Sequence, residues 1–190
     1  MGKIICFISE EFADFEVTLA FHKIKIVGKR EILSMGYCYE SVVSESGLHY
    51  KPNLTVKEAM ELDDIEGLII PGGPIRNQHK ELTELIIKLD QEEKMIAAVC
   101  NGPQYLGRAG ILNKRKFTTS CTSERISKLG VKDPFPRENY LDQRVVRDGH
   151  VITARGRAFV DFSFEIFDYL NIYQGKYQER DLLFQEIMDR

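Results

Sequence analysis

The chain has 190 residues, with 26 lysines and arginines against 29 aspartates and glutamates, so its formal net charge is −3. This length suits a single domain with a sizeable core, and the 43% share of hydrophobic residues excludes disordered and low-complexity classes. The nearly balanced charge argues against nucleic-acid binding, which usually needs a basic excess. No apolar run approaches the roughly 18 residues that span a bilayer, and the first residues do not resemble a signal peptide. We therefore expect a cytoplasmic protein without nucleic-acid or membrane partners.

The expected elements alternate between strands and helices along the chain. The first half predicts a buried strand at 3–8, a helix from 15 to about 28 and a strand at 31–34. It then predicts short strands or a hairpin within 37–55, around 44–47, followed by an apolar strand at 66–70 and an amphipathic helix at 81–89. The second half predicts an apolar strand at 95–99, a helix at 101–109, a short strand at 117–119, a hairpin over 144–153, a helix at about 158–170 and a last helix after Gly175.

This alternation indicates an α/β fold, in which helices cover both faces of a mostly parallel central sheet. We find no repeat or linker, so we expect one domain over 1–190, with 171–190 as a C-terminal helical extension. The last helix either packs on its own domain or forms a dimer contact.

Four cysteines lie at positions 6, 38, 100 and 121, and four histidines at 22, 49, 79 and 150. No Cys-x-x-Cys pair occurs, and the histidines lack ligand spacing from the cysteines, so we expect neither a metal site nor another cofactor. In a reducing compartment the cysteines are free thiols. The histidines are interpreted mainly as surface or helix residues, and only His22 and His79 are candidates for a place near a site.

Cys100 occupies an unusual position, because it follows the apolar strand at 95–99 and precedes a helix. Sites of open α/β sheets lie at the carboxyl ends of strands. A strand, a nucleophile and a helix in this order form an elbow that holds the nucleophile in a strained, exposed turn. We expect the helix N-terminus to lower the pKa of the Cys100 thiol and favour the thiolate. The alternative is a buried cysteine that only ends a strand.

Paired glycines follow the strand at 66–70. The N–H of Gly73 could form an oxyanion hole with the N–H of Asn101. The alternative is a tight turn that simply requires glycine.

Four acids follow the first strand. Glu10, Glu11 and Asp14 fit the role of helix caps. Glu16 differs, because it begins the apolar stripe of the helix, where its carboxyl could contact the thiol. A proton shared with Cys100 would raise the pKa of Glu16 and stabilise the thiolate.

Together these motifs resemble the PfpI-like intracellular protease/amidase family, which belongs to the class I glutamine amidotransferase-like superfamily and has the parkinsonism-associated deglycase as a relative. The segments that carry the resemblance are 11–16, 21–24, 69–73, 99–104 and 109–112. They run along nearly the whole chain, and the elbow is the most specific of them. The resemblance implies a flavodoxin-like sandwich and a homodimer or larger oligomer.

The resemblance also implies site residues: Cys100 as the reactive group, Glu16 as a buried acid hydrogen-bonded to its sulfur, and Gly73 and Asn101 as oxyanion donors. The candidate binding residues around them are Gly72, Gly102, Ser120, Cys121 and His22.

The chain departs from the family pattern in its histidines. Protease-type members carry a histidine directly after the cysteine, where this chain has Asn101. They also use a glutamate of the neighbouring subunit from the loop after Gly-Gly, and the segment 74–78 here has no acid. The deglycase relatives carry a histidine after a Thr-Thr strand, where Ser120 and Cys121 stand here.

Three functions remain open. The first is an enzyme in which the Cys100 thiolate attacks a small electrophilic substrate, in hydrolase, amidase, hydratase or glyoxalase-type chemistry. Peptide hydrolysis is disfavoured, because Asn101 cannot protonate an amine leaving group. The second is a redox or stress sensor whose Cys100 is oxidised to the sulfinate, with Cys121 as a candidate resolving thiol. The third is a binding scaffold without activity.

Overall fold

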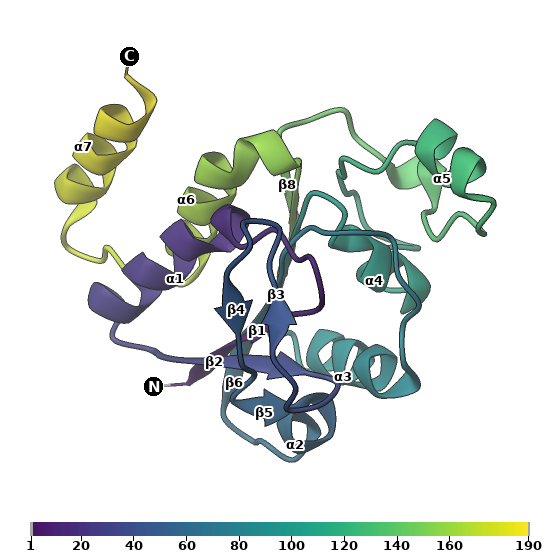
Figure 1. Ribbon diagram of the computed structural model, residues 1–190. Coiled ribbons are helices and arrows are strands. Elements are labelled where there is room, and N and C mark those ends of the chain that lie inside the picture. The colour runs from purple at the N-terminus through teal and green to yellow at the C-terminus, as the bar shows by residue number, and fades with distance from the viewer. Residues whose placement is uncertain (1, 190) are drawn as a thin grey trace.

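A seven-stranded sheet forms the centre of the molecule, with the strand order β5-β2-β1-β6-β7-β9-β8 (Figure 1). The computed structural model describes residues 2–189. The strands of this sheet are β1 (Lys3–Phe7), β2 (Glu31–Gly36), β5 (Leu54–Thr55), β6 (Ile65–Ile70), β7 (Met95–Val99), β8 (Val145–Asp148) and β9 (Val151–Ala154). Neighbouring strands are parallel except β8 and β9, which form the predicted hairpin. The mostly parallel sheet is therefore confirmed.

Helices cover both faces of the sheet (Figure 1). One face packs against α1 (Phe15–Ile26) and α6 (Phe159–Tyr169), and the other against α2 (Val56–Met60), α3 (Lys80–Gln91) and α4 (Pro103–Arg108). The remaining elements are the antiparallel ribbon of β3 (Val42–Val43) and β4 (His49–Tyr50), the helices α5 (Ser123–Leu129) and α7 (Tyr177–Met188), and the short 3-10 turns η1 (Arg137–Asn139) and η2 (Gly156–Ala158).

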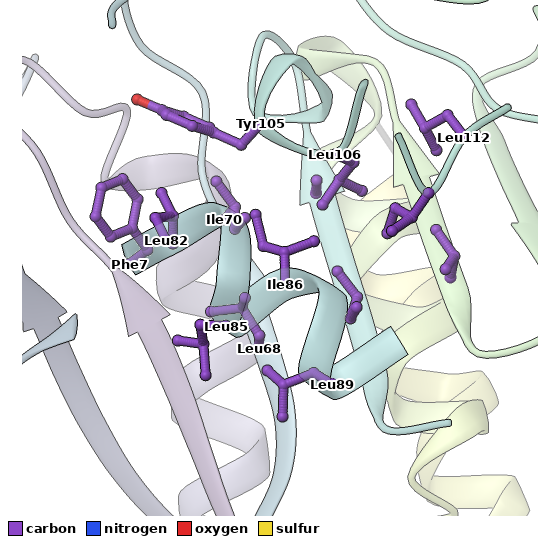
Figure 2. Packing of buried hydrophobic residues seen from close by; sticks show 14 of the residues in the cluster. Phe7, Leu68, Ile70, Leu82, Leu85, Ile86, Leu89, Tyr105, Leu106 and Leu112 are labelled. Carbon is purple, nitrogen blue, oxygen red and sulfur yellow. The ribbon is translucent and has the colours of Figure 1, made fainter. Parts of the chain in front are cut away.

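The two cores follow from the alternation of side chains along each strand. In β1, Ile5 and Phe7 face the core under α3, whereas Ile4 and Cys6 face the core under α1 and α6. Figure 2 shows Phe7 with the apolar residues of α3 and α4 that cover the first core. A strand buried on both faces needs apolar residues at every position, which explains the continuous apolar runs.

Three features differ from the elements expected from the sequence. The segment 117–119 is not a strand, because only Phe117 pairs, in a single bridge with Tyr140. Instead, the Thr118 and Thr119 hydroxyls donate to the carbonyls of Gln143 and Cys100. The helices α2 and α5 lie outside the predicted elements.

The interpretation of His150 as a surface or helix residue is wrong. It is buried in the β8–β9 turn, where its Nε2 lies 2.8 Å from Asp90 Oδ1.

The last helix, α7, packs on its own domain through one edge. The ring centroid of Phe184 lies 4.9 Å from that of Phe164 in α6, and Arg180 forms an ion pair with Asp168. Tyr177 and Leu182 remain exposed. A dimer contact through this exposed edge stays a prediction. Within residues 2–189, no helix combines the length and apolar character needed to cross a membrane.

The first core predicts a large stability loss for Leu85→Ala. Leu85 on α3 is fully buried, and the cavity should lower the free energy of unfolding by about 2–5 kcal/mol in a denaturant titration. Leu129→Ala on α5 is the matched control, because that side chain is exposed and should lose less than about 1 kcal/mol. Equal losses in the two variants would contradict this account of the core.

Candidate active site

Cys100 stands in a sharp turn at the carboxyl end of β7. Its φ of +60° lies in the left-handed region, which is uncommon for a residue with a side chain. The turn is fixed on both sides of the residue. The Cys100 N–H donates to Ala154 O at 2.8 Å, and Cys100 O accepts from Ser120 N at 2.9 Å and from Thr119 Oγ1 at 2.7 Å. Backbone strain held by its surroundings is typical of a functional position.

Glu16 reaches Cys100 from the first turn of α1. The carboxyl is buried, with the residue only 2% exposed, and its Oε2 accepts a hydrogen bond of 2.8 Å from the Gly72 N–H. The Cys100 sulfur lies beside this carboxyl, since the two groups border the same space at Gly72 and at Gly156. The structure thus brings together the two residues that the sequence singled out as a pair.

Two glycines enclose the pair from opposite segments. A Cβ on Gly72 would lie 2.5 Å from Glu16 Oε2 and 2.7 Å from Cys100 Cβ. A Cβ on Gly156 would lie 2.6 Å from Glu16 Oε1 and 3.0 Å from Cys100 Sγ. Any side chain at either position would force the carboxyl and the thiol apart, so both glycines are required by this contact.

Gly156 was missed by sequence reasoning, which placed no site residue after the last strand. It stands in η2, directly after β9, and its N–H donates to Ser120 Oγ at 2.9 Å. The available signal was a lone glycine between a buried strand and a helix, at the same edge of the sheet as Cys100.

The protonation of the pair differs from the expectation. Burial raises the pKa of Glu16 to about 7, against the opposing effect of the Gly72 hydrogen bond. Burial and the negative charge of Glu16 raise the pKa of the Cys100 thiol to about 12, although hydrogen bonds from Ser120 and from the Asn101 N–H favour the thiolate. The expected lowering of the thiol pKa by the helix N-terminus is therefore wrong. The helix α4 has only six residues and begins three positions beyond the sulfur, so burial and the carboxylate outweigh it.

Asn101 occupies the position directly after Cys100 and is 3% exposed. Its Nδ2 donates to Gly73 O at 2.7 Å, which ties the elbow to the Gly-Gly turn. Its Oδ1 is buried without a hydrogen-bond partner among the described residues.

A pocket of about 640 Å³ opens over the sulfur. Cys100, Asn101 and Gly73 line its floor. The charged residues of its wall are Glu10, Glu11, Glu45 and Arg125. This volume suits a small molecule. No group of three or more metal-ligating side chains occurs within residues 2–189.

Other candidate residues lie outside this pocket. Gly102 packs backbone against backbone, since a Cβ there would lie 2.5 Å from Ile70 O. Cys121 is fully buried in the core under α3, on the other face of the sheet from Cys100. His22 is exposed on α1, and His79 stacks on Tyr37 beside a different pocket.

The enclosing role of Gly156 predicts a specific effect of Gly156→Ala. The methyl group should separate carboxyl from sulfur, cost about 1–3 kcal/mol of unfolding free energy and slow alkylation of Cys100 at pH 7. Mass spectrometry of iodoacetamide-treated protein measures the rate. Gly175→Ala is the control. The φ of +75° at Gly175 makes alanine costly there, but no atom lies within 4 Å of the added Cβ, so the active site is left unchanged. Unchanged Cys100 alkylation in Gly156→Ala would contradict the role assigned to this glycine.

Known proteins are similar in sequence to most of this chain. The model of the DJ-1/PfpI family matches residues 2–169. Deglycase PfpI of Pyrococcus furiosus is 30% identical over 158 residues, which cover 80% of this chain and 89% of that protein. Isonitrile hydratase of Pseudomonas putida is 31% identical over 127 residues, which cover 64% of this chain and 51% of that protein.

The fold is also shared with a solved structure. A DJ-1 superfamily protein from Agrobacterium tumefaciens, 27% identical in sequence, superposes with a TM-score of 0.82 over 98% of each chain. This agreement confirms the fold expected from the sequence. The chain belongs to the DJ-1/PfpI family.

Proposed function

We propose that the protein is a cysteine-dependent enzyme that acts on a small electrophilic substrate, with an α-oxoaldehyde as the first candidate. The observation that carries this proposal is the buried contact between Glu16 and Cys100, which opens into a pocket for a small molecule. The names of the relatives, a deglycase and an isonitrile hydratase, support an enzyme that attacks a small electrophilic group.

The first step is a proton transfer from the Cys100 thiol to the Glu16 carboxylate. A thiol with a pKa of about 12 is not ionised in advance, so its proton needs an acceptor, and Glu16 with a pKa near 7 is a suitable one. The sulfur then forms a bond to the carbonyl carbon, and the electron pair of the C=O bond moves to oxygen. The N–H groups of Gly73 and Asn101 stabilise that oxyanion.

The later steps use the same carboxyl group. Protonated Glu16 returns its proton to the oxyanion, which gives a hemithioacetal. Glu16 carboxylate then takes the proton of the former aldehyde carbon and delivers it to the adjacent carbonyl carbon, while the hydroxyl proton of the hemithioacetal passes to the oxygen of that carbonyl. These two transfers convert the hemithioacetal to the thioester of a hydroxy acid. Water hydrolyses the thioester to a hydroxy acid and restores the thiol. In sum, one water is added to the oxoaldehyde and no external oxidant or reductant is needed.

The sensor alternative receives less support from the site. Oxidation begins at an exposed thiolate of low pKa, whereas the pKa of Cys100 is raised. Cys121 is buried in the opposite core and would have to leave it to act as a resolving thiol. The homodimer and the cytoplasmic location stay predictions.

The proposal predicts turnover of methylglyoxal to lactate that depends on Cys100 and Glu16. Cys100→Ser should abolish it, because the hydroxyl is a far weaker nucleophile, and Glu16→Gln should lower kcat/KM by about 10²–10⁴-fold. In the wild type, kcat/KM should rise with pH through about 7, as Glu16 becomes the carboxylate that accepts the proton. Glu16→Gln should lose this rise.

Cys121→Ala is the matched control, because it removes a cysteine that does not line the pocket. Its kcat/KM should remain within about twofold of the wild type. Methyl isocyanide, assayed in parallel, tests hydration of an isonitrile carbon by the same thiol. Absence of turnover of both compounds, or turnover unaffected by Cys100→Ser, would overturn the proposal.

A further inference from the structure

A second pocket, of about 760 Å³, lies beside the catalytic pocket. It is formed where β1 and β2 end, together with the loop that precedes α3 and the end of α4. Glu10 lines both pockets, and an ion pair joins their walls: Arg76 lines the second pocket, Glu11 lines the catalytic one, and Arg76 Nη2 lies 2.9 Å from Glu11 Oε2. The second pocket thus adjoins the catalytic one, and its lining residues other than Glu10 are its own.

Two guanidinium-bearing residues converge on one wall of this pocket. Gln104 Oε1 accepts hydrogen bonds from the Arg76 backbone N at 3.1 Å and from Arg108 Nη1 at 2.9 Å. Both positive charges also act on the phenol of Tyr105 and lower its pKa, against the larger effect of burial. A single amide oxygen thus holds the Arg108 guanidinium next to the backbone of Arg76.

The side chains of these two arginines have more N–H donors than the neighbouring residues provide acceptors. Arg108 is partly buried, and within residues 2–189 no carboxylate forms an ion pair with it. Arg76 Nε is buried and lacks a hydrogen-bond partner in the same part of the chain. A buried donor without an acceptor is costly, so the wall favours an incoming oxygen acceptor.

Among residues 2–189, Arg108 and Lys132 are the positive charges of this pocket that form no ion pair, whereas Arg76 is paired with Glu11. Lys132 adds a third positive charge, and Glu10 and Glu40 are the two acids that line the pocket. The Oε2 of Glu10 accepts a hydrogen bond from Val43 N at 3.1 Å, which fixes the position of this carboxylate. The stacked rings of Tyr37 and His79, with centroids 3.7 Å apart, add a flat wall.

We propose that this second pocket binds a small molecule through an oxyanion group, a phosphate or a carboxylate, held by Arg76 and Arg108. The planar guanidinium fork matches the oxygen geometry of such groups and forms charge-assisted hydrogen bonds to them. The binding does not depend on catalysis at Cys100, so its test is independent of the proposed function.

Cys38 supplies a direct readout, because it is exposed and lines the same pocket. In a Cys100→Ala background the remaining thiols, Cys6 and Cys121, are buried. Maleimide labelling of Cys38 is followed while inorganic phosphate, and separately succinate, is added at constant ionic strength set with chloride. Saturable protection by phosphate or succinate is expected, and the stronger of the two identifies the class of oxyanion.

Arg108→Gln should weaken the protection by about tenfold or more, which is the loss expected for a charge-assisted hydrogen bond. Arg125→Gln is the matched control, because it removes one positive charge from the catalytic pocket instead and should change the protection less than about twofold. Lys132→Gln, at an exposed residue, is a second test variant if Arg108→Gln fails to fold, and it should weaken the protection as well.

Three results would overturn the proposal. The first is that neither phosphate nor succinate protects Cys38. The second is that Arg108→Gln and Lys132→Gln are protected as strongly as the parent protein. The third is that Arg125→Gln alone loses protection, which would place the anion in the catalytic pocket.

Discussion

The site depends on the burial of two ionisable groups in contact, the carboxyl of Glu16 and the thiol of Cys100. Neither group can be fully charged there at low cost, because burial penalises both anions and each anion repels the other. The pair therefore retains a proton near neutral pH, and once Glu16 is ionised that proton rests on the sulfur, beside a carboxylate that can accept it. This property gives the sulfur an acceptor for its proton without a histidine, and the position after the cysteine is Asn101 in this chain.

The fold supplies this contact from segments far apart in the sequence. The parallel sheet brings the ends of β6, β7 and β9 to one edge, and α1 begins at that edge after β1 (Figure 1). Each segment then contributes one group: Glu16, the Gly72 N–H, the Cys100 sulfur and the space left at Gly156. Because the two glycines leave no room for a side chain, the geometry of the pair is set by backbone packing rather than by flexible side chains.

Local sequence patterns predicted most of the fold, whereas features that depend on contacts between distant segments could not be predicted. Apolar runs and helical spacing located the main strands and helices, and the strand-to-helix turn pointed to Cys100. The helix α2 lay outside the predictions, although Thr55 and Glu58 form a capping box that the sequence displays. The only local signal for Gly156 was a glycine between a strand and a helix, because its role arises from contact with residues 56 or more positions away. The direction of the thiol pKa was wrong for the same reason, since burial is a tertiary property.

The central claim is most directly tested by the rate of Cys100 alkylation as a function of pH, in the wild type and in Glu16→Gln. For a pair that shares one proton, the apparent pKa belongs to the pair. The account predicts that alkylation of the wild type rises with a midpoint near 7. In Glu16→Gln this step should vanish, and alkylation should rise only at much higher pH, because burial still raises the pKa of the isolated thiol. Identical curves for the two proteins, or a midpoint near the ordinary thiol pKa of about 8.5 in both, would contradict the account.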